Sequence, residues 1–569
     1  MLSHGQILLR QPMLAAIATR HARGFTSTRL APSTNSESDQ VELGQVSIVD
    51  LAKVAFQHEL DKPNYTKLPR LAHNLDRVLF NPGVHQLQDT RTKVYNFDPW
   101  LKAIPSMDEF DHDKLRPFVK PSEDATLHKK ARKMNAKYAG STSSLTGLLS
   151  QLYFLISGWR PVSTQMLSQR FTKLPTHFTR GSRFPASVYL RYKANRDIYT
   201  VDADKVFDED ENILQILGRP MEKFLTLPKV QFKKFLKASK SGKETDREVY
   251  TYNRIGSLLM RSQLDCYDPR LPGKAFDLKT RATIAIRLLL SDLSDATGYE
   301  IKRSKGVLES FEREYYDLIR AAFLKYNMQA RIGGMDGIFV AYHNTRKLFG
   351  FEYIPLEEID RCIFGSTRKA RDYFLYCVRL LNILFDTIAQ KYPKQTTLVS
   401  FENRRNRSSM LIYVEAIPQG QDNSRLTLEN DLVVVPESTE VTMYKVDQYQ
   451  SQHSIALDEV QPDRAETIHA EYRIEELDIS PADKRDRYRA FRQRQHEWFD
   501  DNAERRDAKA AGFAEELLVQ MDDDDTPNTF KALLKEISAR HALQAKDDVE
   551  PAVKEVWWPR HRVSSPAHK

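Results

Sequence analysis

The chain has 569 residues, of which 41% are hydrophobic and 10% aromatic, so it can bury a core and is too long for one small domain. Its three cysteines exclude a disulfide framework and a four-cysteine zinc or iron–sulfur site. The net charge of +8 favours a polyanionic partner only where that charge is clustered. The most apolar stretch, residues 145–159, is short and contains Ser150, Gln151 and Ser157, so no membrane-spanning segment is expected.

The first 25 residues have the composition of a mitochondrial presequence. Arg10, Arg20 and Arg23 precede the first acid, Glu37, and the segment contains no lysine. A positive, helix-capable segment of this kind is imported along an electrical potential and then removed. We expect a presequence at residues 1–25, a polar linker at 26–46 and a mitochondrial protein. The alternative is an ordinary basic N-terminus.

The next region changes character near residue 126. Residues 47–125 contain short apolar runs broken by prolines, which predicts irregular, partly helical structure wrapped on a core. Residues 126–240 look mainly helical, with helices beginning near Leu145 and covering 212–217 and 229–238. The run Ser141 to Ser144 is suited to cap the first of these helices.

A mixed α/β pattern follows from about residue 249. Residues 254–265 and 275–279 read as two strands joined by a turn at 269–273. Long helical patterns cover 306–328 and 368–391, and residues 337–342 and 409–417 read as further strands. We therefore expect an α/β core at 126–418, in which helices flank a mixed central sheet.

The last part of the chain is charged and polar. Residues 483–520 form a charged helical pattern with little apolar stripe, and an acidic cluster follows at Asp522 to Asp525. This composition predicts a partly disordered C-terminal tail at 419–569, or a partner-binding arm.

Three residues stand out as candidates for chemistry. Asp265 ends one predicted strand, and Asp277 and Lys279 share a face of the next because side chains alternate along a strand. Two neighbouring carboxylates repel each other unless a cation lies between them, and Mg²⁺ prefers oxygen ligands. A cation there could polarise a phosphate and lower the pKa of a water molecule, while Lys279 stabilises the developing charge. The pattern predicts hydrolysis of a phosphodiester.

Several motifs carry a resemblance to known proteins. The block from Asp265 to Asp277-Leu278-Lys279-Thr280 resembles the RecB-like branch of the PD-(D/E)XK nuclease superfamily. Over roughly residues 120–420 the chain also resembles a fungal mitochondrial RNA-processing family. The blocks that carry this second resemblance are Ser141 to Ser144, Ile198 to Asp204, Gln263 to Arg281 and Gly333 to Gly337.

The resemblance implies specific roles and a cellular setting. Asp265 and Asp277 would bind Mg²⁺ or Mn²⁺, and Lys279 would be the catalytic lysine. Superfamily members usually add an acid from the helix before the first core strand, for which Glu222 and Glu248 are the candidates here. The family is described as processing RNA 5′ ends and degrading transcripts 5′ to 3′ on the matrix side of the inner membrane. It is linked to the mitochondrial RNA polymerase.

Positive charge is concentrated in one region. Residues 116–200 contain 15 Lys or Arg against three acids, with aromatic residues interleaved. Such charge follows a phosphate backbone, and exposed aromatic rings stack on unpaired bases. The alternative is a solvated face whose aromatic residues belong to the core. The best candidates for contacting nucleic acid are Arg180, Arg183, Arg191, Lys193 and Arg196.

The leading hypothesis is an Mg²⁺-dependent 5′-to-3′ exoribonuclease that trims and degrades mitochondrial transcripts. One alternative is a non-catalytic RNA-binding factor that keeps a degenerate nuclease fold and recruits or stimulates other RNA enzymes. A second is a mitochondrial DNA-repair exonuclease, because the three-residue site does not distinguish RNA from DNA.

Overall fold

A computed structural model of the chain describes residues 46–50, 58–61, 63–207, 213–240, 248–404, 409–448, 471–499 and 526–547. The chain separates into two units, residues 1–42 and 43–569, and every described residue lies in the second. The expected presequence lies outside the described residues, as does the expected linker apart from residue 46.

A large mixed sheet forms one layer of the described part of the chain. Most neighbouring strands are antiparallel, but β4 is parallel to both β6 and β8. In spatial order the eleven strands are β1 (Val46–Asp50), β18 (Glu471–Glu476), β17 (Val441–Gln448), β14 (Ser409–Ala416), β13 (Thr397–Asn403), β5 (Ala186–Lys193), β6 (Ile198–Ala203), β4 (Tyr138–Ser141), β8 (Leu258–Leu264), β7 (Val249–Ile255) and β2 (His58–Asp61).

A smaller mixed sheet contains the strand with the predicted catalytic residues. Its described strands, in spatial order, are β3 (Val84–Gln86), β12 (Leu348–Pro355), β11 (Gly337–His343), β10 (Ala275–Ala282) and β9 (Cys266–Tyr267). Strand β10 pairs in parallel with β11 and antiparallel with β9. A separate two-stranded ribbon consists of β15 (Thr427–Glu429) and β16 (Leu432–Val434).

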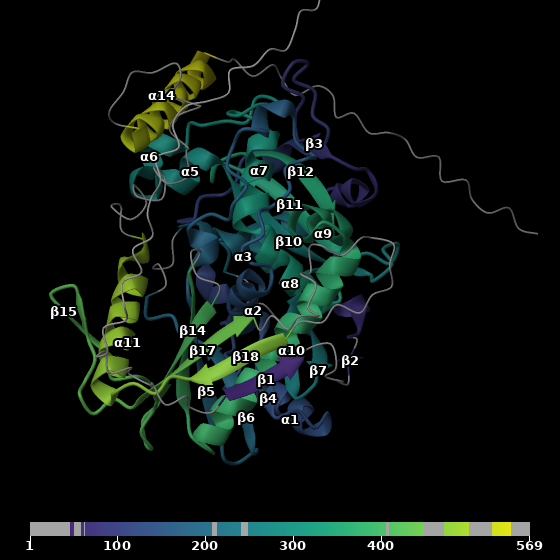
Figure 1. The fold of residues 1–569 in the computed structure, drawn as a ribbon. Helices are drawn as coiled ribbons and strands as arrows, with labels where there is room; N and C mark the ends of the chain where they lie inside the picture. The colour runs from purple at the N-terminus through teal and green to yellow at the C-terminus, as the bar shows by residue number, and fades with distance from the viewer. Residues whose placement is uncertain are drawn as a thin grey trace, which may run out of the picture. The chain divides into compact units, whose positions relative to one another are not determined.

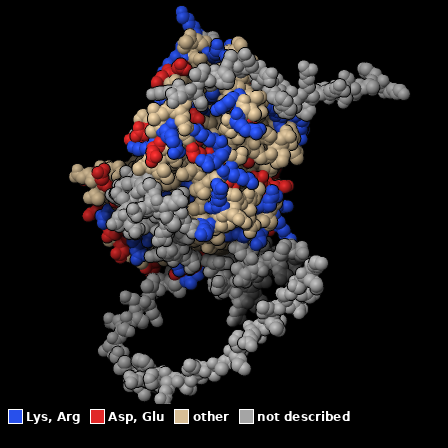
Figure 2. Space-filling view, turned by 90° about the horizontal axis from the view of Figure 1, so that it is seen from above, with Lys and Arg blue, Asp and Glu red and all other residues tan. Residues whose placement is uncertain are grey.

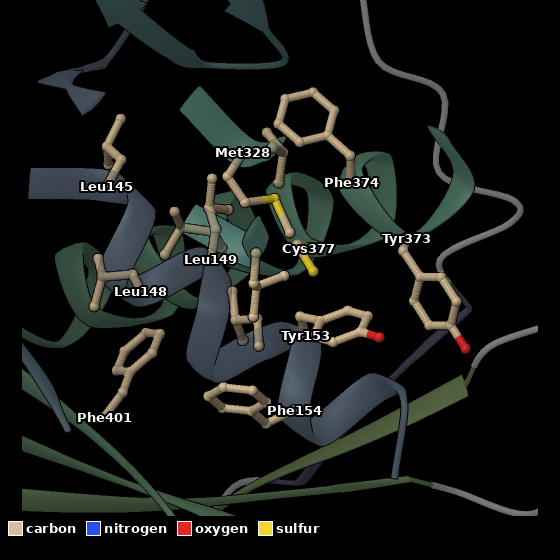
Figure 3. Close-up of a cluster of buried hydrophobic side chains, with 14 of the residues drawn as sticks. Leu145, Leu148, Leu149, Tyr153, Phe154, Met328, Tyr373, Phe374, Cys377 and Phe401 are labelled. Carbon is tan, nitrogen blue, oxygen red and sulfur yellow. The ribbon is translucent and has the colours of Figure 1, made fainter. Parts of the chain in front are cut away.

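Helices fill the space between the two sheets (Figure 1). The main ones are α2 (Thr142–Ile156), α7 (Phe311–Ala321), α8 (Phe323–Gly333), α9 (Leu356–Phe364) and α10 (Thr367–Lys391). Their buried side chains form one apolar cluster with residues of both sheets. Figure 3 shows its centre, where Leu149 and Tyr153 of α2 approach Met328 of α8 and Cys377 of α10. Burying this apolar surface is what holds the two sheets together.

Further helices cover the outer faces. Helix α3 (Ile213–Thr226) packs on β10 through a second apolar cluster, and α4 (Lys229–Phe232) lies beside it. Helix α1 (Ala125–Lys133) packs on β4 and β6, and α11 (Pro481–His496) packs on β17. The short helices α5 (Ile284–Leu288) and α6 (Leu293–Ala296) contact α14 (Thr526–Asp547). The expected α/β fold, a mixed sheet flanked by helices, is confirmed.

Local sequence signals explain where the central elements begin and end. The Ser141 backbone N–H donates to Ser144 Oγ at 3.2 Å, so the predicted serine cap does start α2. Helix α8 ends at Gly334, whose φ of +62° lies in the left-handed region that glycine adopts without strain. The glycine-containing run 333–337 therefore connects α8 to the buried strand β11.

Two sequence-based expectations about secondary structure were wrong in part. Residues 126–240 are not mainly helical, because β4, β5 and β6 lie there and belong to the large sheet. Residues 254–265 are not one strand, because Gly256, at φ +63°, begins a turn between β7 and β8. In both places short strands pair with distant partners, which local periodicity does not reveal.

The region after residue 418 also differs from the expected loose tail wherever it is described. Strands β17 and β18 extend the large sheet beyond β14, and α11 packs on β17. Arg492 of α11 is buried and donates to Asp204 Oδ2 at 2.8 Å. The high charge of α11 hides this role, since Tyr488 and Phe491 supply its apolar contact. No helix in the described ranges is long and apolar enough to cross a bilayer.

Candidate active site on strand β10

Strand β10 presents polar and apolar side chains on opposite faces. Asp277, Lys279 and Arg281 alternate with Phe276 and Leu278, as residues on a strand must. Phe276 and Leu278 join the apolar cluster beneath α3. The polar face meets α7 and α8, through the contacts described below. One face of the strand thus carries three charged side chains at alternate positions.

Lys279 and Asp277 form a close ion pair. The Nζ atom of Lys279 lies 2.6 Å from Asp277 Oδ2 and 4.0 Å from Asp265 Oδ2. The Asp277 side chain is fully buried, whereas Lys279 and Asp265 keep 21% and 12% of their side-chain surface exposed. The pair is therefore enclosed at the Asp277 end and reachable from solvent at the Lys279 end.

Asp265 reaches the same place from the neighbouring strand. It lies between β8 and β9, and β9 pairs with β10 so that Cys266 is opposite Phe276. Its Oδ2 atom accepts a hydrogen bond from the Leu278 backbone N–H at 3.0 Å. The structure therefore brings Asp265, Asp277 and Lys279 together.

Burial and the neighbouring carboxylate act against a charged Asp277 in this site. Burial raises the pKa of Asp277 well above its usual range; the Lys279 ammonium opposes this and the Asp265 carboxylate adds to it. Burial alone would lower the pKa of Lys279, but the Asp277 and Asp265 carboxylates raise it overall. Lys279 therefore stays protonated, whereas burial disfavours the charged form of Asp277. A second cation would relieve the remaining repulsion.

Helix α8 supplies two site residues that sequence reasoning missed. Gln329 Nε2 donates to Asp277 Oδ1 at 3.1 Å, and Lys279 Nζ lies 5.6 Å from the centre of the Tyr326 ring. The two residues are three apart and so share one helical face. Helix α8 also carries Lys325, Asn327 and Arg331, so the polarity of its side chains did not single out these two residues. Only the packing of α8 against β10 shows which strand they face.

The donor set fits a hard divalent cation. Asp277 Oδ2 is buried, makes no hydrogen bond of good geometry within the described residues and lies 2.6 Å from Lys279 Nζ. Such an unsatisfied carboxylate oxygen, with Asp265 beside it, is the kind of ligand that Mg²⁺ or Mn²⁺ takes. Among the described residues, no three His, Cys, Asp or Glu side chains are grouped closely enough to form a metal site by themselves. Water or substrate oxygens would have to complete the coordination.

The two candidates for a third acid differ in their surroundings. Glu222 lies on α3. The pKa of the Cys266 thiol is raised first by burial, then by the Asp265 carboxylate and then by the Glu222 carboxylate. Glu222 therefore sits near the site, next to the residue that follows Asp265. Glu248 instead accepts a hydrogen bond from the Tyr250 hydroxyl and lies 3.6 Å from Arg219. These partners hold Glu248 in a separate ion pair.

The predicted nucleic-acid-binding cations lie elsewhere in the fold, around β5. Arg191 is on β5 and donates to Asp202 Oδ2 and Asn423 Oδ1, each at 2.9 Å. Arg180 donates to the Trp498 carbonyl, and its guanidinium lies 4.6 Å from the centre of that ring. These two side chains therefore make internal contacts.

The remaining three cations have fewer internal roles in the described contacts. Arg183 donates weakly to the Thr179 carbonyl at 3.4 Å. Lys193 ends β5, and Arg196 is exposed in the turn between β5 and β6. Elsewhere on the surface, Figure 2 shows Lys and Arg side chains gathered across the middle of one face with fewer acids among them.

Comparisons with known proteins give the family context of this site. Residues 118–386 match the Pet127 family, described as "Mitochondrial protein Pet127". These Pet127-like residues run from before α1 into α10 and include Asp265, Asp277 and Lys279. The match agrees with the resemblance to a mitochondrial RNA-processing family.

Two curated Pet127 proteins align over a similar length. The chain is 41% identical over 334 residues to "mRNA degradation protein pet127, mitochondrial" of Schizosaccharomyces pombe, covering 57% of this chain and 63% of that protein. It is 41% identical over 344 residues to "Putative mitochondrial translation system component PET127" of Saccharomyces cerevisiae, covering 57% and 41%. The chain thus spans less than two thirds of the length of either Pet127 relative.

Solved structures offer a weaker likeness. The crystal structure of Scheffersomyces stipitis Rai1 is 14% identical, with a TM-score of 0.33, over 56% of this chain and 83% of that one.

Proposed function

We propose that this chain acts in the processing and turnover of mitochondrial RNA, as a metal-dependent phosphodiesterase that trims transcript 5′ ends. The observation that carries the proposal is the convergence of Asp265, Asp277 and Lys279 at one partly exposed point. The Pet127 match and the mRNA-degradation name of the Schizosaccharomyces pombe relative support RNA as the substrate. A PD-(D/E)XK-like core is the fold context that this proposal implies.

Each residue has a role that follows from its position. Asp277 and Asp265 would hold a divalent cation, preferably Mg²⁺, which supplies Lewis-acid activation of the scissile phosphate. Lys279, charged and reachable from solvent, stabilises the negative charge that develops on the phosphate oxygens. Gln329 holds Asp277 in place through Oδ1, and Oδ2 would be the oxygen that remains to bind the cation. Glu222 is the candidate for a further acid.

The cellular setting is proposed from the composition and the relatives. The basic N-terminal segment would direct the protein to the mitochondrion, on the matrix side. Association with the inner membrane and with the mitochondrial RNA polymerase belongs to the same proposal. The candidates for guiding the RNA strand are the five predicted cations, Arg180, Arg183, Arg191, Lys193 and Arg196.

The direct test is cleavage of 5′-labelled single-stranded RNA by the purified chain, with Mg²⁺ or with a chelator. We expect release of labelled 5′-terminal nucleotides or short fragments with Mg²⁺ and none with the chelator. Single-stranded DNA of the same sequence serves as the competing substrate. Preferred cleavage of the DNA would favour a repair exonuclease. Cleavage that continues in chelator would show that the reaction does not require a divalent metal ion.

A non-catalytic RNA-binding factor is the second candidate. The observation that favours it is the lack, in the described residues, of three grouped acid, histidine or cysteine side chains. Such a factor would bind RNA equally well with and without Mg²⁺ and leave it intact. Binding and cleavage measured on the same RNA therefore separate the two functions.

A further inference from the structure

Arg281 lies on the same face of β10 as Asp277 and Lys279 and makes no described hydrogen bond to either of them. It is two positions beyond Lys279, about 6.6 Å further along a strand. Its side chain is 10% exposed, against 21% for Lys279. Tyr326 of α8 lies near this row, with its ring centre 5.6 Å from Lys279 Nζ. Arg281 therefore forms the deeper end of the same polar row.

The guanidinium of Arg281 is not satisfied by protein groups. Its Nε and Nη2 atoms are buried and have no hydrogen-bond partner in the described structure. The nearest carboxylate oxygen, Glu314 Oε2, is 3.8 Å from Nε, beyond hydrogen-bonding distance. Burial and the neighbouring Arg287 lower the pKa of Arg281 to about 10, so even there it stays charged at neutral pH.

The nearby acids already have other partners. Glu314 accepts from Arg287 at 2.6 Å and from the Ile284 backbone N–H at 2.8 Å. Asp317 accepts from Arg287 at 2.7 Å and from Arg313 at 3.2 Å. In this cluster three guanidinium groups therefore face two carboxylates, and the positive charge left over is on Arg281.

A buried, charged donor without a hydrogen-bond partner destabilises the folded chain and calls for an explanation such as a bound ion. An anion with several oxygens would satisfy Nε and Nη2 together, because a guanidinium edge matches phosphate geometry. A phosphate monoester carries up to two negative charges at neutral pH and would balance the leftover charge. The enclosed position favours a phosphate at the end of a strand over one with chain continuing on both sides.

We propose that Arg281 binds a terminal phosphate of the RNA strand whose next linkage lies at Asp277 and Lys279. This rests on the proposed function and adds an end-recognition subsite to it. The spacing along β10 is of the order of one nucleotide, so the strand end would be held while the adjacent phosphodiester reaches Lys279. A 5′-phosphate and a 3′-phosphate share this chemistry, and the experiment distinguishes them.

The first test needs no cleavage and no RNA. In the full chain, Arg281→Met replaces an unsatisfied charge by an apolar side chain of similar size. We expect its Tm, measured in phosphate-free buffer, to equal or exceed that of the wild type. Inorganic phosphate should raise the wild-type Tm by about 2 °C or more relative to chloride at equal ionic strength, and should not affect Arg281→Met. The exposed Arg91→Met is the control and should respond like the wild type.

Two results of the first test would overturn the proposal. A Tm several degrees lower for Arg281→Met would identify Arg281 as a structural partner of Glu314. A wild-type Tm that does not respond to phosphate would show that no anion binds there. Neither result bears on whether Asp277 and Lys279 cleave RNA.

The second test measures binding of labelled RNA in chelator, so that nothing is cleaved. RNA with a 5′-phosphate, a 3′-phosphate or hydroxyl ends is compared on the wild type, Arg281→Met and Arg281→Lys. We expect the wild type to bind RNA with one kind of phosphorylated end about tenfold tighter than RNA with hydroxyl ends. RNA without the terminal phosphate lacks the hydrogen bonds between that phosphate and the charged Arg281. The preference should vanish in Arg281→Met and shrink in Arg281→Lys, which lacks the two-pronged edge. Equal binding of all ends by the wild type, or a preference retained in Arg281→Met, would contradict the subsite.

Discussion

Gln329 of α8 and Asp277 of β10 are joined by a hydrogen bond of 3.1 Å, although 51 residues separate them in the chain. The bond occupies Oδ1 and leaves Oδ2 to face Lys279. A helix packed between two sheets thus orients the one fully buried carboxylate of the site. The predictions below test this arrangement and the fold that supports it.

Replacing Lys279 by methionine should abolish most of the RNA cleavage. The substitution removes the charge that faces the scissile phosphate while keeping a side chain of similar length. Loss of one stabilising donor of this kind costs about 10²–10³-fold in rate. The measurement is the single-turnover cleavage rate at saturating Mg²⁺. Lys274→Met, at an exposed turn residue five positions earlier, should cleave normally; equal losses in both variants would contradict the role of Lys279.

Gln329→Met should shift the pH dependence of cleavage. Without the donor to Oδ1, the charged form of Asp277 loses stabilisation, so its pKa rises further and the acidic limb of the rate profile moves to higher pH. A hydrogen bond to a charged group of about 1.5 kcal/mol corresponds to about one pH unit. The exposed Lys325→Met on the same helix should leave the limb in place. A lower rate with an unmoved limb would make Gln329 merely structural.

The two halves of the site differed in how well they could be predicted. The sequence could predict Asp265, Asp277 and Lys279 as neighbours, because a turn and the alternation of side chains along a strand are local patterns. It could not predict Gln329 and Tyr326, because the face that α8 turns toward β10 depends on packing between distant elements. The same reason explains β17 and β18, whose partners lie far away in the chain and whose flanking residues are highly charged. Arg281 was within the recognised block, but only its missing partners in the structure single it out.

Glu352 should make the fold less stable as the pH rises. Burial raises the pKa of Glu352 to about 7, although the Tyr342 hydroxyl that donates to it at 2.6 Å opposes the shift. Between about pH 4.5 and 7 the unfolded chain loses this proton and the folded chain keeps it. Stability from this group is therefore present at low pH and declines by up to about 1.4 kcal/mol per pH unit across that window.

The variant Glu352→Gln isolates this effect, since a neutral amide still accepts from Tyr342. We expect the variant and the wild type to have similar free energies of unfolding at pH 4.5 and the variant to be about 1–3 kcal/mol more stable at pH 7.5. Urea unfolding at both pH values provides the measurement. A difference between the two proteins that is independent of pH would mean that Glu352 is ionised in the fold.

Arg492→Leu should loosen the outer part of the large sheet. It leaves Asp204 buried without its ion-pair partner, which typically costs about 3–5 kcal/mol. Faster amide hydrogen exchange in β17 and α11, together with a lower urea midpoint, is the expected signature. Arg489→Leu on the same helix breaks an exposed pair with Asp486 and should change stability by less than about 1 kcal/mol. Similar rates of amide hydrogen exchange in the two variants would indicate that residues 481–496 belong to the loosely folded tail expected from composition.

The most direct test of the central claim compares the wild type with Asp277→Asn for both Mn²⁺ binding and RNA cleavage. Asparagine keeps the shape and a hydrogen-bond acceptor but removes the buried charge. The account predicts that the substitution weakens Mn²⁺ binding at least about tenfold and eliminates cleavage. Mn²⁺ affinity and cleavage that both remain at the wild-type level would contradict it.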